Sequence, residues 1–189
     1  MRSAERPAVI ALDGHDGSGK TTLAKALAER MDARYVRTFG SPHGAALMAA
    51  YRRRDSGGVL EAGVKAVEAA LDLAAGGPAV LDRGWLTVAT LVPADLFAAR
   101  WWLWVPTALL WCDLPTTLAR LGQRGAETPE TTAWHADFLA IYEDRRLLRD
   151  GPTIRTDLKS VEQCLDELET LLRESADSVA SSDARAGRR

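Results

Sequence analysis

Short apolar runs alternate along the chain with longer segments in which apolar residues recur every three or four positions. A short uninterrupted apolar run is typical of a parallel strand that is buried on both faces. A recurrence near about 3.6 residues is typical of a helix with one buried side. The pattern predicts strands over 8–12, 34–38, 79–81, 108–112 and 153–155. It predicts helices over 20–31, 43–54, 59–75, 86–91, 116–121, 131–148 and 160–172.

Strands that alternate with helices predict one α/β domain, with a five-stranded parallel sheet covered by helices on both faces. Ligands of such sheets bind just beyond the carboxyl ends of the strands, so we expect chemistry directly after Leu12, Thr38, Leu81 and Cys112. The domain is expected to span residues 1–173. The tail 174–189 is rich in Ser, Ala, Asp and Arg without an apolar period, and we expect it to be disordered.

The turn after the first predicted strand reads Gly14-His-Asp-Gly-Ser-Gly-Lys-Thr-Thr22, which fits the phosphate-loop spacing G-x-x-x-x-G-K-[ST]. Glycines let successive backbone N–H groups converge on an anion, and the helix start adds its positive dipole end. Lys20 supplies a charge for the β- and γ-phosphates, and the Thr21 hydroxyl suits Mg²⁺. We therefore expect ATP and Mg²⁺ as cofactors. The expected phosphate-binding residues are Gly14, Asp16, Gly17, Ser18, Gly19, Lys20, Thr21 and Thr22.

The composition and charge of the chain exclude several classes of protein. The chain has 189 residues with 24 Lys and Arg against 26 Asp and Glu, a net charge of -2, so we expect no nucleic-acid partner. Its two cysteines exclude a disulfide scaffold and indicate the cytoplasm. The longest uncharged apolar stretch, 101–112, is shorter than the ~18 residues that span a bilayer, so neither a membrane partner nor a targeting segment is expected.

A small kinase is favoured over other P-loop proteins. The loop lies near the first residue of a short chain, and no Asn-Lys-x-Asp stretch is present to read guanine. The segment from Leu12 to Thr22 resembles the thymidylate kinase family of P-loop nucleoside monophosphate kinases, whose loop commonly reads F-E-G-x-D-G-S-G-K-T-T. Further matches follow in the same order. They are Asp82-Arg83-Gly84 after the third strand, Asp113-Leu-Pro115 before Arg120 and Arg124, and Tyr142 on a late helix.

The resemblance implies the P-loop NTPase fold with a short arginine-bearing lid over about 120–134. It also implies a homodimer, and transfer of the γ-phosphoryl of ATP to a nucleoside monophosphate such as dTMP. By the same resemblance, Asp13 orients the acceptor or accepts its proton. The match is loose where the acceptor base would lie, because Gly84 replaces a tyrosine and Lys65 is the only basic residue of 60–73. A modified nucleotide, a nucleoside or another small metabolite therefore remains an alternative acceptor, and a non-catalytic nucleotide-binding protein is the alternative of another class.

Charged and aromatic residues near the strand ends supply the other candidates. Asp82 is expected to hold Mg²⁺ with Thr21, and Arg83 to hold the acceptor phosphate or the transferring group. Arg120 and Arg124 lie four apart, on one face of a helix, and are expected to close on the γ-phosphate. The expected catalytic residues are Lys20, Asp13, Arg83, Arg120 and Arg124. The expected acceptor-binding residues are Asp13, Arg37, Phe39, Arg83 and Trp85, while Arg52–Arg54 and Tyr142 stay open between acceptor contacts and surface or packing roles.

Overall fold

The computed structural model describes residues 8–40, 42–124 and 130–186, with residues 176–186 described by their backbone alone. Its strands are β1 (Val9–Asp13), β2 (Arg34–Arg37), β3 (Ala79–Asp82), β4 (Thr107–Trp111) and β5 (Thr153–Arg155). Its helices are α1 (Lys20–Arg30), α2 (His43–Arg52), α3 (Ser56–Ala74), α4 (Trp85–Ala89), α5 (Ala94–Arg100), α6 (Leu114–Gln123), α7 (Thr132–Arg146) and α8 (Val161–Ala186).

The five strands form one parallel sheet in the order β2-β3-β1-β4-β5, so the predicted α/β fold class is confirmed. The central strand β1 pairs with both β3 and β4, and its register places Leu12 opposite Asp82 and Asp13 opposite Leu109. The loops after β1 and β3 therefore leave the sheet side by side at its carboxyl edge. This is the edge at which ligands of parallel sheets bind.

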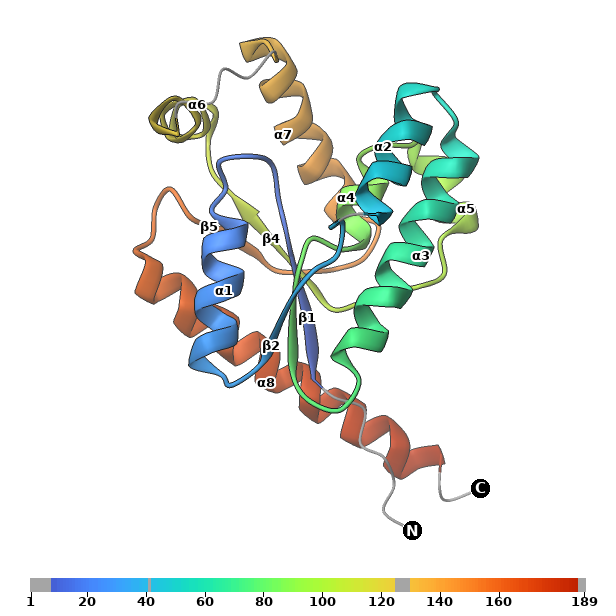
Figure 1. Cartoon of the computed structure of the whole chain (residues 1–189). Helices are drawn as coiled ribbons and strands as arrows, with labels where there is room; N and C mark the ends of the chain where they lie inside the picture. Colours follow the sequence, from blue (N-terminus) through green and yellow to red (C-terminus); the bar gives the residue numbers. More distant parts are fainter. Residues whose placement is uncertain (1–7, 41, 125–129, 187–189) are drawn as a thin grey trace.

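Alternate residues of each strand point to opposite faces of the sheet, which gives the domain two separate cores. Along β1, Ile10 and Leu12 pack against α1 and α8, whereas Ala11 faces the core that α2, α3, α4, α5 and α7 cover. Figure 1 shows this three-layer arrangement, with α1 and α8 on one side of the sheet and α3 on the other. Asp13 is two residues beyond Ala11 and so lies on the α4 and α7 side, where it becomes part of the site.

The structure differs from the sequence prediction at two segments. Helix α5 was not predicted, because Pro93 and a stretch of only seven residues give little periodicity; Phe97, which is completely buried, anchors it. Helix α8 continues to Ala186, so the backbone is helical past Glu174, where the sequence analysis expects a disordered tail. Residues 174–186 contain neither Gly nor Pro, so nothing in their sequence ends the helix. No helix within the described residues has the length and apolar character that crossing a membrane requires.

Candidate active site

The loop between β1 and α1 adopts a conformation that its glycines make possible. Gly14 has a φ of 155°, and a Cβ added there would lie 2.2 Å from the carbonyl oxygen of Leu110. No other residue fits this close approach of two backbones. Gly17 and Gly19 also have φ values in the left-handed region, 83° and 84°. These φ values suit the tight turn in which the N–H groups of a phosphate-binding loop converge on an anion.

Helix α1 begins at Lys20, and no side chain caps its first turn. The free N–H groups and the helix dipole at this end suit a phosphate. Lys20 is only 7% exposed; its Nζ donates to the carbonyl oxygen of His15 at 3.2 Å and to Asp16 Oδ1 at 3.3 Å. Burial, together with the nearby charge of Arg83, lowers the pKa of Lys20 to about 8, although Asp16 opposes the shift. Ser18 is buried within the loop, whereas Thr22 is exposed on α1.

Asp16 links the loop to the β3–α4 connection. Its Oδ1 accepts a hydrogen bond from Arg83 Nη2 at 2.8 Å, besides the one from Lys20. Burial opposes ionisation, but the positive charges of Lys20 and Arg83 lower the pKa of Asp16 to about 2. The carboxylate is therefore ionised at neutral pH and occupies the space between the two cations.

Thr21 and Asp82 meet where the sequence analysis predicts the metal. The Thr21 hydroxyl donates to Asp82 Oδ2 at 2.7 Å, and the Tyr35 hydroxyl donates to the same oxygen at 2.9 Å. A hydroxyl and a carboxylate are the hard oxygen donors that Mg²⁺ prefers, so the pair fits this ion. Among the described residues no cluster of three or more His, Cys, Asp or Glu could hold a metal. Two protein ligands accord with Mg²⁺ that is otherwise held by substrate phosphates and water.

The β3–α4 connection explains why Gly84 stands where the resembling family has a tyrosine. Arg83 has a φ of 76°, a conformation that is strained for a residue with a side chain. A Cβ on Gly84 would lie 2.8 Å from the Cβ of Ala11. The absence of that atom lets the Gly84 N–H reach Asp13 Oδ2 at 2.8 Å. The departure from the family pattern thus serves a contact with the central strand.

Asp13 is completely enclosed, and both its oxygens are engaged. Oδ2 accepts from the Gly84 N–H, and Oδ1 accepts a short hydrogen bond from the Thr87 hydroxyl. Burial raises the pKa of Asp13, although Thr87, Arg83, Gly84 and Lys20 oppose the shift. In this structure Asp13 contacts Thr87 rather than open space, so any role toward an acceptor runs through Thr87.

A cavity of about 620 Å³ opens beside the loop, between α2 and α7. Figure 1 shows these two helices on opposite sides above the carboxyl edge of the sheet. Phe39 and Arg83, which the sequence predicts to bind the acceptor, both line the cavity, and so do Asp16 and Arg52. Tyr142, left open between an acceptor contact and a packing role, also lines the cavity. Tyr51, Trp134 and Phe138 were not predicted, although the spacing of four between Trp134, Phe138 and Tyr142 places these three on one face of a helix. The aromatic lining is Phe39, Tyr51, Trp134, Phe138 and Tyr142.

Two histidines join the phosphate loop to α7. His15 Nε2 lies 2.8 Å from His135 Nδ1, and both rings are almost fully buried. The ring of His15 stacks on Phe138 with centroids 5.9 Å apart, so it extends the aromatic wall of the cavity. Burial lowers the pKa of His15 to about 4, although the charge of Asp16 opposes the shift. At neutral pH the His15 ring is therefore neutral, and one hydrogen bond joins it to His135.

The buried histidine makes stability depend on pH. Unfolded His15 takes up a proton near pH 6.5 and folded His15 only near pH 4, so stability is expected to fall as the pH drops through this window. The contribution is on the order of 3 kcal/mol. Urea unfolding at several pH values should show that His15→Asn loses less free energy of unfolding than the wild type as the pH drops. His43→Asn, which lies outside the pair, should keep the pH dependence of the wild type. Identical pH dependence of wild type and His15→Asn would contradict this assignment.

Two of the residues predicted to contact the acceptor, Trp85 and Arg37, do not line the cavity. Trp85 is wrong as an acceptor contact: it is 2% exposed, its indole N–H donates to the Val105 carbonyl oxygen at 3.1 Å, and its ring packs edge-on against Trp104. It follows a strand end, but the turn directs it into the core rather than toward the cavity. Arg37 is exposed at the end of β2 and is not among the described residues that line the cavity.

The two lid arginines occupy different positions. Arg120 donates to the carbonyl oxygen of Gly17 at 3.0 Å and to the Thr156 hydroxyl and carbonyl oxygens at 3.0 and 2.7 Å. Its guanidinium therefore ties the phosphate loop to the end of β5. Arg124 is exposed at the end of α6. The centre of the predicted lid, residues 125–129, lies outside the described residues.

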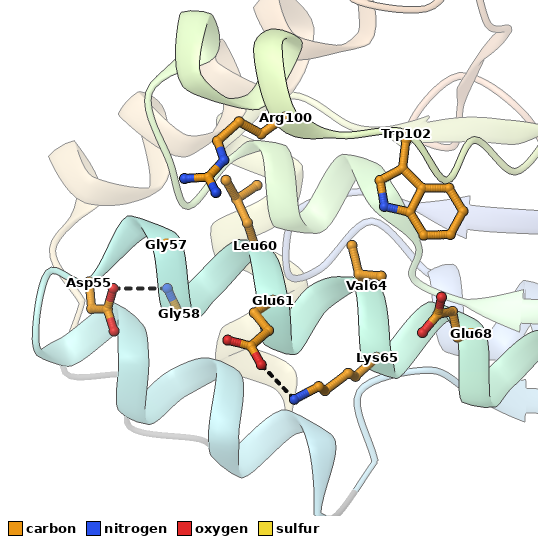
Figure 2. A pocket seen from close by; sticks show the side chains of 10 residues that line it. All are labelled: Asp55, Gly57, Gly58, Leu60, Glu61, Val64, Lys65, Glu68, Arg100 and Trp102. Carbon is orange, nitrogen blue, oxygen red and sulfur yellow. Dashed lines mark hydrogen bonds and ion pairs between the residues drawn. The ribbon is translucent and has the colours of Figure 1, made fainter.

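A second hollow, of about 670 Å³, lies away from the carboxyl edge of the sheet. Figure 2 shows it on the outer face of α3, where Lys65 pairs with Glu61 and the exposed ring of Trp102 lies to one side. None of the predicted site residues lines it. The cavity beside the phosphate loop is therefore the candidate acceptor site.

The fold and the loop define a P-loop nucleotide-binding domain with the fold of the small P-loop kinases. The chain matches the model of the AAA domain family over residues 10–147, and it belongs to that family. No curated protein matches the chain significantly.

Solved structures share the fold at low sequence identity. Thymidylate kinase from Candida albicans aligns with a TM-score of 0.64 and 15% identity, over 90% of this chain and 94% of its own. Deoxyadenosine kinase from M. mycoides with bound dATP aligns with a TM-score of 0.61 and 15% identity, over 87% and 99%. Shikimate kinase from Acinetobacter baumannii in complex with shikimate aligns with a TM-score of 0.59 and 18% identity, over 90% and 95%. At these identities the likeness establishes the fold, and these proteins differ in the molecules that they bind.

Proposed function

We propose that this protein is a phosphotransferase that moves the γ-phosphoryl group of ATP to a small acceptor in the cavity between α2 and α7. The observation that carries the proposal is the position of the cavity. Asp16 and His15 of the phosphate loop form part of its lining, so a nucleotide on the loop and a molecule in the cavity would share a boundary. Holding two reactants at such a boundary is what catalysis of phosphoryl transfer chiefly requires.

The chain's own residues divide the work of binding. The glycines of the loop and the start of α1 bind the donor phosphates, and Lys20 neutralises their charge. Thr21 and Asp82 would hold Mg²⁺, which when bound neutralises charge on the β- and γ-phosphates. Arg83 faces the cavity beside Asp16, and so can contact the transferring group from the acceptor side. The resemblance to thymidylate kinases favours a nucleoside monophosphate as acceptor, with a modified nucleotide, a nucleoside or another small metabolite as alternatives.

The test is ADP release from the purified full chain with ATP and Mg²⁺, measured against a panel of nucleosides, nucleoside monophosphates and ring alcohols. We expect one class of acceptor to stimulate ADP release well above the rate with water alone. Tight ATP binding by calorimetry without stimulation by any acceptor would instead establish a non-catalytic nucleotide-binding protein.

We also propose that Arg124 contacts the γ-phosphate during transfer, as an arginine supplied by the same chain. Because such a contact acts in the transition state, Arg124→Ala should lower kcat by about 10²-fold and leave ATP affinity nearly unchanged. Steady-state kinetics and calorimetry measure the two effects separately. Arg173→Ala, on the exposed surface of α8, is the matched control. An unchanged kcat in Arg124→Ala would exclude this role.

A further inference from the structure

A chain of hydrogen bonds runs from the acceptor cavity to the enclosed carboxylate of Asp13. Tyr142 and Thr87 both line the cavity, and their hydroxyl oxygens lie 3.2 Å apart. The Thr87 hydroxyl donates to Asp13 Oδ1. Arg83 Nη1 donates to the oxygens of both Thr87 and Tyr142 at 3.3 Å. Residues of β1, the β3–α4 connection, α4 and α7 thus meet in one polar network.

The direction of each bond in this network follows from counting protons. An ionised carboxylate only accepts, and a guanidinium only donates. The single hydroxyl proton of Thr87 goes to Asp13, so Tyr142 must donate its own proton to Thr87. The Thr87 oxygen then accepts from Tyr142 and from Arg83, which uses both its lone pairs. The Tyr142 oxygen accepts only from Arg83 in this network, so it keeps one acceptor position for a molecule in the cavity.

Asp13 has the properties of a proton acceptor at the end of such a chain. Arg83, Lys20 and Tyr142 are the titratable groups that face it, and the two cations favour its ionised form. Burial outweighs them and raises its pKa. A carboxylate with a raised pKa binds a proton more readily than an ordinary surface aspartate does. Full enclosure also prevents water from taking the place of the Thr87 hydroxyl.

We propose that the acceptor is a neutral alcohol with a flat ring, and that its hydroxyl proton leaves through Tyr142 and Thr87 to Asp13. This inference rests on the proposed function and names the group that reacts. The acceptor hydroxyl gives its proton to the Tyr142 oxygen, Tyr142 gives its proton to Thr87, and Thr87 gives its proton to Asp13 Oδ1. The acceptor oxygen forms a bond to the γ-phosphorus as the bond from that phosphorus to the bridging oxygen breaks, and ADP leaves. Asp13 returns the proton by the same route once the product has gone.

A phosphate acceptor has no need of this chain. The second pKa of a phosphate monoester is about 6, so at neutral pH most of it presents a bare oxygen that requires no base. The charges of the residues that line the cavity also favour a neutral acceptor. Among the described residues that line the cavity, two cations, Arg52 and Arg83, stand against two carboxylates, Asp16 and Glu130, and Arg83 is already paired with Asp16. This balance offers no net positive charge to a dianion, whereas the aromatic walls suit an uncharged ring.

The experiment compares nucleosides with their matching monophosphates, using thymidine, deoxyadenosine and deoxycytidine, and adds shikimate as a ring alcohol that carries a negative charge and no flat base. ADP release is measured on the full chain with ATP and Mg²⁺, and the phosphorylated product is identified by mass spectrometry. We expect a nucleoside to be phosphorylated, and the monophosphates and shikimate to be poor acceptors. The acceptor is then the class that the sequence resemblance does not favour.

Variants test the proton route. Tyr142→Phe and Thr87→Val should each lower kcat about 10²-fold with the KM for ATP unchanged, and Thr87→Ser should restore most of the loss. Wild-type kcat should fall as the pH drops through the raised pKa of Asp13, because only the carboxylate accepts a proton, and this limb should disappear in Tyr142→Phe. Thr107→Val, whose hydroxyl bonds the Val105 carbonyl oxygen away from the cavity, is the control that should keep wild-type kinetics. Far-UV circular dichroism verifies that each variant is folded.

The failures are distinguishable. Efficient phosphorylation of monophosphates but not alcohols would overturn the acceptor class and leave the proposed phosphotransferase intact. Phosphorylation of an alcohol with an unchanged kcat in folded Tyr142→Phe, or in folded Thr87→Val, would overturn the proton route. Bound ATP without stimulation by any acceptor would refute the proposed function itself.

Discussion

Replacing Lys20 with alanine is expected to lower kcat/KM for ATP by about 10³-fold, because Lys20 is the only lysine or arginine of the loop segment 14–22. Lys20 Nζ is held by two loop oxygens, from His15 and Asp16, so its charge is positioned before the nucleotide arrives. A preorganised charge costs no rearrangement when the transition state forms. Calorimetry for ATP affinity and ADP release for turnover measure the loss.

The matched control is Lys25→Ala, an exposed lysine on the same helix whose ammonium lies over the Tyr35 ring. It should retain ATP affinity and turnover. A second expectation follows from the lowered pKa of Lys20, about 8: ATP affinity of the wild type should decrease as the pH rises above this value, because the neutral amine binds phosphate poorly. ATP affinity in Lys20→Ala close to that of the wild type would contradict the loop's assignment as the donor site.

Replacing Trp85 with alanine should destabilise the protein by about 3–5 kcal/mol, the cost of emptying the place of a large buried aromatic ring. Its ring packs edge-on against Trp104 with centroids 4.9 Å apart and tilts toward Phe97 at 6.1 Å. The truncation also leaves the Val105 carbonyl oxygen without the indole donor. Urea unfolding followed by circular dichroism measures the change.

Trp102→Ala is the control for this variant, because the Trp102 side chain is 62% exposed beside the second hollow, on the outer face of α3 (Figure 2). This substitution should change the free energy of unfolding by less than about 0.5 kcal/mol. Trp85→Phe keeps a ring in the core and should retain the wild-type KM for the acceptor. A raised acceptor KM in Trp85→Phe at unchanged stability would return Trp85 to the acceptor site.

Local sequence patterns were sufficient to predict the phosphate loop and the strand and helix on either side of it. The loop is marked by the apolar run before Asp13, the glycine spacing and Lys20. These features lie within a few residues of one another, so the sequence alone reveals them. Parallel strands bring their carboxyl ends to one edge, so Thr21 and Asp82 lie together, joined by a hydrogen bond of 2.7 Å. That they hold Mg²⁺ stays a prediction. The prediction for Trp85 was wrong because the direction of a side chain after a strand depends on the conformation of the turn. Here Arg83 adopts a left-handed backbone conformation, which an arginine in the sequence gives no reason to expect.

The sequence by itself determined the fold class, and it placed the candidate donor loop at the carboxyl edge of the sheet, because periodicity and motif spacing are properties of contiguous segments. The cavity beside the loop, the His15–His135 pair and the hydrogen bonds that join Tyr142, Thr87 and Asp13 were decided only by the tertiary structure. Their partners lie 55 to 120 positions apart along the chain. Contacts across such separations depend on how α4 and α7 pack on the sheet, and no local pattern encodes that packing.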